Sequence, residues 1–153
     1  MSILCELFIA EPADAPLYEE LCDDEAEGGR FERVLLGGMN SLQFEPLLGI
    51  MEREVRMASI PYRRPSGPEV HRLEQVGEPE KTDTSWVFRF PTGFVAWLAA
   101  LDAPRAAAVT EQWARTEELS TSPEDIEHVV SSLMELARLA VASNRGLYMW
   151  GSL

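Results

Sequence analysis

The stretch Ser122–Leu153 constrains the fold of this chain more than any other part of it. It opens with the residues Ser122, Pro123, Glu124 and Asp125, which together form a strong helix start. The proline suits the first helical position, and the acids face the positive end of the helix dipole. We expect the Ser122 hydroxyl to act as N-cap and accept a hydrogen bond from a free backbone N–H of the first turn.

The residues after this start predict an amphipathic helix followed by a strand. Asn144 or Gly146 can adopt the left-handed conformation that ends such a helix. The segment Leu147–Trp150 has large residues on both faces, which favours a strand covered on both sides within a sheet. Leu139 falls on the polar side of the helix and is an exception to its pattern. The apolar stripe consists of Ile126, Val129, Val130, Leu133, Leu136, Ala137, Ala140 and Val141.

The earlier segments mix strands and helices without the regular alternation of a doubly wound fold. We therefore expect a single α+β domain over residues 1–153. Its centre would be a mixed or antiparallel sheet with helices packed on it, and the C-terminal helix would lead into a closing strand. The predicted strands cover residues 2–10, 31–36, 70–76 and 85–90, and the predicted helices begin near Asp14, Met39, Pro91 and Pro104.

Each of these earlier helices has apolar residues that we expect to face the core. Asp14 would cap the first helix, and the fourth would end near Leu119. The expected inner residues are Leu17, Tyr18 and Leu21 in the first helix, and Leu42, Leu47, Leu48 and Met51 in the second. They are Phe94, Val95, Leu98 and Leu101 in the third helix, and Ala106, Val109, Thr110 and Trp113 in the fourth.

The chain is strongly acidic, because 26 Asp and Glu against 13 Lys and Arg give a net charge of −13 at pH 7. That charge opposes binding to nucleic acid and to anionic membrane surfaces, since both require basic residues. It is compatible with a basic protein partner. The densest group of acids is a candidate surface for such a partner, although a solvated loop is the simpler interpretation. This group consists of Asp23, Asp24, Glu25 and Glu27.

The charge bias reverses between residues 53 and 72, where arginines outnumber acids. Arginine presents a planar fork to carboxylate or phosphate, so this region is a candidate site for an anionic ligand. The alternative is that the arginines offset the acidic surface. The proline-rich residues 61–69 are expected to form an irregular loop. The candidate ligand-binding residues are Arg53, Arg56, Tyr62, Arg63, Arg64 and Arg72.

No residue pattern predicts catalysis, a metal site or a cofactor. Cys5 and Cys22 are the only cysteines, which is a poor disulfide framework for a domain of this size and favours a reducing compartment. We expect Cys5 to be a buried hydrophobic residue. His71 and His128 lack a second histidine or cysteine at ligand spacing. The chain has neither a signal peptide pattern nor an apolar run long enough to cross a bilayer, so we expect a cytoplasmic protein.

Two functions are compatible with these observations. The first is a non-enzymatic protein-binding module, for example an immunity-type protein whose acidic surface covers a basic partner. The second is a small-molecule binder or enzyme that holds an anionic ligand in the Arg53–Arg72 region.

The order of the predicted elements resembles that of the YfbM-like bacterial domains, a family of unknown function. The resemblance rests on the opening strand Ile3–Ile9, on the turn that leads into the Leu42–Met51 helix, and on the late helix that feeds Leu147–Trp150. The order of elements is similar over most of the chain, but the two share no sequence motif. The glycine-containing opening typical of the family is missing here. The resemblance implies an α+β fold and no established activity, so it assigns no site residues.

Overall fold

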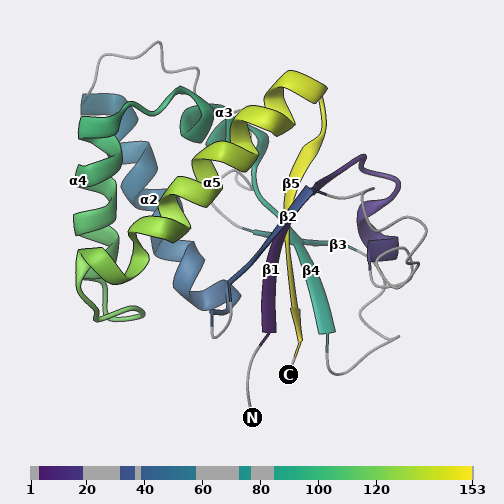
Figure 1. The fold of residues 1–153 in the computed structure, drawn as a ribbon, viewed down its shortest axis with the longest axis horizontal. Helices are drawn as coiled ribbons and strands as arrows, with labels where there is room; N and C mark the ends of the chain where they lie inside the picture. The colour runs from purple at the N-terminus through teal and green to yellow at the C-terminus, as the bar shows by residue number, and fades with distance from the viewer. Residues whose placement is uncertain (1–3, 19–31, 37–38, 58–72, 77–84, 153) are drawn as a thin grey trace.

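The computed structural model of the chain describes residues 4–18, 32–36, 39–57, 73–76 and 85–152. These residues form an α+β fold with an antiparallel sheet, as the order of elements predicted. Helices α2, α3, α4 and α5 lie on one face of the sheet, and the short helix η1 lies on the other (Figure 1). The strands are β1 (Leu4–Ala10), β2 (Glu32–Leu35), β3 (Glu74–Val76), β4 (Ser85–Arg89) and β5 (Gly146–Ser152). The helices are η1 (Ala15–Leu17), α2 (Ser41–Met57), α3 (Thr92–Ala100), α4 (Ala103–Ala114) and α5 (Pro123–Ser143).

The C-terminal strand β5 lies at the centre of the sheet, whose order is β2-β1-β5-β4-β3. It pairs antiparallel with β1 on one side and with β4 on the other. Leu147 and Met149 face the helices, while Tyr148 faces the opposite side, and all three are at most 1% exposed. The prediction of a closing strand covered on both faces is therefore confirmed. The central position also means that the sheet is complete only when β5 has joined it.

Helix α5 begins and ends at the predicted residues, but its N-cap differs in detail. Ser122 is the N-cap, Pro123 is the first helical residue, and Asn144 ends the helix in the left-handed conformation with φ 54° and ψ 42°. The Ser122 hydroxyl was expected to accept a backbone hydrogen bond. Instead it donates to Oδ2 of Asp125 at 2.9 Å. A charged carboxylate in the first turn is a stronger acceptor than the hydroxyl itself, so the hydroxyl turns its proton toward it.

The apolar stripe of α5 is buried from Ile126 to Ala140, as predicted. Val141 is the exception, with 55% of its surface exposed. It lies about 100° around the helix from Ala140, at the margin of the stripe. Leu139 is 41% exposed, which agrees with its predicted place on the polar side.

Three details of the earlier helices differ from the predictions. Leu17 and Leu42 are 43% and 66% exposed, and the Asp14 side chain makes no cap hydrogen bond. Because η1 is a 3-10 helix, residues three apart share a face, so Ala15 and Tyr18 are buried in place of Leu17. In α2 the buried face includes Phe44, which the sequence pattern did not single out.

The remaining differences concern element ends. Helix α4 ends at Ala114, and turns continue the chain to Leu119, so the fourth predicted helix is shorter than expected. The other strands match the prediction to within a few residues where they are described, and Leu21 lies outside the described part.

Candidate functional site

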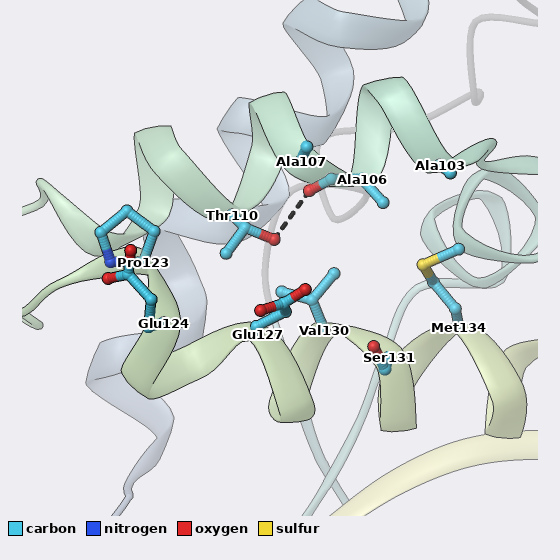
Figure 2. A pocket seen from close by; sticks show the side chains of 10 residues that line it. All are labelled: Ala103, Ala106, Ala107, Thr110, Pro123, Glu124, Glu127, Val130, Ser131 and Met134. Atoms are coloured by element: carbon cyan, nitrogen blue, oxygen red, sulfur yellow. Dashed lines mark hydrogen bonds between the residues drawn. The ribbon is translucent and has the colours of Figure 1, made fainter.

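An open groove of about 390 Å³ lies between α4 and α5 (Figure 2). Helix α4 contributes Ala103, Ala106, Ala107 and Thr110. Helix α5 contributes Pro123, Glu124, Glu127, Val130, Ser131 and Met134. A volume of this size lies within the range of ordinary ligand sites.

The α4 wall of the groove presents an apolar surface made of small side chains. Its alanines recur at helical spacing, so their methyl groups form one smooth face. The only hydroxyl on this wall belongs to Thr110, which donates to the backbone oxygen of Ala106 at 2.7 Å (Figure 2). That bond uses the hydroxyl proton within α4 itself. The wall therefore offers contact to apolar groups and leaves little opportunity for polar recognition.

The α5 wall carries the charge of the groove. Glu124 and Glu127 are three residues apart, so their side chains are neighbours on the helix surface, and both are exposed. Glu124 lies at the end of the groove near Pro123, Glu127 lies further along, next to Val130, and Met134 and Ala103 lie at the other end (Figure 2). Within the described residues, neither carboxylate has an ion pair or a hydrogen bond. The groove is thus acidic from Glu124 to Glu127, and beyond Glu127 its described lining is apolar except for Ser131.

The arginines near the groove are already engaged elsewhere. Arg105 lies 3.6 Å from the carboxylate of Asp102, and Arg115 lies 2.6 Å from that of Glu111. Arg138 donates to backbone oxygens at the end of α3, to that of Ala99 at 3.3 Å and to that of Leu101 at 3.1 Å. No arginine that the structure describes on α4 or α5 is therefore paired with the two glutamates of the groove.

A second group of polar residues lies on the opposite face of the sheet, under η1. The Tyr18 hydroxyl donates to Oε2 of Glu6, and Nη1 of Arg33 lies 3.9 Å from the same oxygen. The Tyr18 ring is buried and stacks on Phe8, with ring centroids 3.9 Å apart. Because its members bond to one another, we interpret this cluster as the anchor that joins η1 to β1 and β2.

The described structure contains few of the site residues predicted from the sequence. Arg53 is exposed on α2, and Arg56 lies in the same helix with a side chain that is not described. Outside the described residues lie Tyr62, Arg63, Arg64, Arg72 and the loop over 61–69. The acidic candidates Asp23, Asp24, Glu25 and Glu27 also lie outside them. The anionic-ligand site and the acidic loop therefore stay predictions, and none of their residues is among the described residues that line the α4–α5 groove.

The cysteines and histidines that the structure describes do not form a catalytic or metal-binding group. Cys5 is a buried free thiol, and burial, with a smaller effect from the charge of Glu6, raises its pKa to about 12. Its prediction as a buried hydrophobic residue is confirmed. His128 is exposed on α5, whereas Cys22 and His71 lie outside the described residues. Within the described ranges, no group of three or more His, Cys, Asp or Glu is placed to hold a metal ion.

Sequence reasoning missed the groove because the signal is weak. The alanines of α4 and the glutamates of α5 are visible in the sequence, but Glu124 indicates only a helix start there and Glu127 belongs to no pattern. A groove depends on how two helices approach each other, which periodicity within one helix does not determine.

No helix in the described part of the chain is both long and apolar enough to cross a membrane. Comparison of the chain with protein-family models, with curated proteins and with solved structures finds no match. The resemblance to the YfbM-like domains consequently stays a prediction.

Proposed function

We propose that this protein is a non-enzymatic binding module that captures a basic segment of another protein, in the manner of an immunity-type protein. The observation that carries the proposal is the α4–α5 groove, in which Glu124 and Glu127 lie unpaired, among the described residues, beside an apolar wall. A cationic side chain with an apolar stem complements both features, because its head pairs with carboxylates while its stem covers apolar surface.

The charge of the whole chain supports the same proposal. A net charge of −13 attracts a basic partner over a distance and raises the rate of encounter. The same charge opposes nucleic acid as a partner. In this proposal the acidic segment with Asp23, Asp24, Glu25 and Glu27 adds to the attraction, and the groove supplies the close contacts.

We further propose a cytoplasmic location. The support is the free, buried thiol of Cys5, because a protein that works in a reducing compartment has no need of disulfides.

The proposal can be tested by capture of partners in the native host. The tagged protein is expressed at native level, cross-linked in the cell, and purified, and the captured proteins are identified by mass spectrometry. We expect a basic protein to be captured, and we expect the purified pair to dissociate more readily as salt rises, since exposed charge pairs are screened. A reproducible partner that is acidic or neutral, or a complex indifferent to salt, would contradict the proposal.

A further inference from the structure

We infer that the partner is recognised through an arginine side chain that enters the α4–α5 groove, with an apolar side chain of the same segment seated near Met134. This inference rests on the proposed function and adds to it the chemical identity of the recognition element and the place where it binds. The segment would lie along the groove, with its arginine between Glu124 and Glu127.

The two glutamates of the groove favour a guanidinium group. Glu124 and Glu127 are adjacent on the surface of α5, so one planar guanidinium with its five N–H donors can bond to both carboxylates. Lysine offers a compact charge without this fork and would hold the two carboxylates less well. Among the neighbouring arginines of this chain, Arg115 pairs with Glu111 and Arg138 donates to the backbone of α3. Arg105 pairs with Asp102 through Nε, and its Nη1 is buried without a hydrogen-bond partner in the described part of the chain.

The alanine wall suits the stem of the same side chain. Thr110 lies across from Glu127, and Ala106 and Ala107 follow further along α4 (Figure 2). The Thr110 hydroxyl is bonded to the Ala106 oxygen rather than offered to a ligand. Methylene groups of an arginine are stabilised when they leave water against such a surface. An anion would be repelled by the two carboxylates of the α5 wall and would find no free donor among the described residues of the alanine wall, so the groove discriminates against anions.

The far end of the groove suits an apolar side chain. Met134 lies there, opposite Ala103, and Val130 lies between it and the glutamates (Figure 2). Methionine is flexible and adapts to apolar groups of different shape. Met134 follows Glu127 by two helical turns, which is about 10 Å along α5. The recognised segment would therefore carry its apolar residue about 10 Å from its arginine.

The inference can be tested with the full chain and a short synthetic peptide that carries one arginine and one leucine at this separation. Binding is followed by the backbone amide signals of the isotope-labelled protein in two-dimensional NMR. We expect the largest shifts at Ala106, Ala107 and Ser131, and an affinity at least about tenfold lower when citrulline, which is neutral and nearly isosteric, replaces the arginine. Shifts confined to other surfaces, or equal affinity for the citrulline peptide, would overturn the inference.

Two pairs of variants distinguish binding in the groove from attraction by the overall charge of the protein. Glu124→Gln with Glu127→Gln should abolish the shifts in the groove, whereas Glu11→Gln with Glu45→Gln removes the same charge at exposed sites outside it and should preserve them. Ala107→Phe should block the groove without changing charge, and Ala142→Phe, at an exposed position of α5 outside the groove, should not. Thermal melting of each variant verifies that it is folded.

The outcomes distinguish this inference from the proposed function. If a basic partner binds the wild type and the groove variants equally, the partner uses another surface, so the inference fails and the proposed function stands. If neither the peptide nor any basic partner binds, both fail. A groove that binds small polyamines as tightly as the arginine peptide would also overturn the inference, because charge alone would then explain binding.

Discussion

The indole N–H of Trp113, near the end of α4, donates to the backbone oxygen of Gln43 in the first turn of α2 at 2.7 Å. Trp113 is fully buried, and its ring also contacts Phe44, with centroids 5.3 Å apart. The side chain of Gln43 donates in turn to the backbone oxygen of Glu118, beyond the end of α4, at 3.3 Å. These contacts fix α4 against α2. Since α4 forms the alanine wall of the groove, the position of that wall depends on them.

Replacing Trp113 should therefore destabilise the protein. Trp113→Phe leaves the Gln43 oxygen without its donor and opens a cavity, and we expect a loss of about 2–3 kcal/mol in the free energy of unfolding. Chemical denaturation followed by circular dichroism measures it. Trp97→Phe, at a half-buried tryptophan on α3, is the comparison and should cost less. Equal losses for the two variants would mean that the Trp113–Gln43 bond contributes nothing specific.

The contact between Tyr18 and Glu6 predicts a smaller effect on the other face of the sheet. Tyr18→Phe preserves the stacking on Phe8 but removes the hydroxyl that donates to Glu6, so we expect a loss of about 1–2 kcal/mol in the free energy of unfolding. Leu17→Ala, at the exposed neighbouring position, should change stability by less than about 0.5 kcal/mol. Denaturant titration of both variants checks the prediction. If Tyr18→Phe leaves the free energy of unfolding unchanged, the bond to Glu6 does not anchor η1.

The N-terminus of α5 predicts a dependence of stability on pH. Hydrogen bonds from the side chain of Ser122, and then from that of Thr121, hold the pKa of Asp125 below its usual value of 3.8. An acid with a lowered pKa in the folded state stabilises the fold fully above its unfolded pKa, and this contribution is lost as pH falls through the folded pKa. The melting temperature of Asp125→Asn should therefore lie below that of the wild type near neutral pH. The difference should shrink as pH drops below 3.8. A constant difference across this range would contradict the assignment.

The buried thiol of Cys5 predicts slow chemical modification. Because burial raises its pKa to about 12, almost no thiolate forms at neutral pH, and the sulfur is also inaccessible. We expect a thiol-specific reagent to leave Cys5 unmodified in the folded protein and to modify it in denaturant, as measured by peptide mass spectrometry. Rapid labelling of Cys5 under native conditions would mean that β1 separates readily from its neighbours.

The features predicted correctly from the sequence are those that local chemistry determines. The start of α5 after Ser122 and its stripe from Ile126 to Ala140 follow from residue type and spacing alone, and Asn144 is one of the two residues expected to end it. The aromatic and apolar residues of β5 indicated burial on both faces for the same reason. These two elements organise the fold, which explains why the α+β class could be predicted.

The features that were wrong or missed depend on contacts between elements. The exposure of Leu42 and the burial of Phe44 reflect where α2 meets α4, which helical periodicity alone does not specify. The groove arises from the approach of α4 to α5, so neither helix reveals it by itself. The direction of the Ser122 hydroxyl bond was wrong because a nearby carboxylate competed with the backbone.

The most direct test of the central claim is the dissociation constant of the purified complex with the captured basic partner, measured by calorimetry at fixed salt. We predict that Glu124→Gln with Glu127→Gln weakens binding by at least about tenfold. The remote pair Glu11→Gln with Glu45→Gln, which removes the same charge, should weaken it by less than about threefold. Equal weakening by the two pairs, or none by the groove pair, would contradict the assignment of binding to the α4–α5 groove.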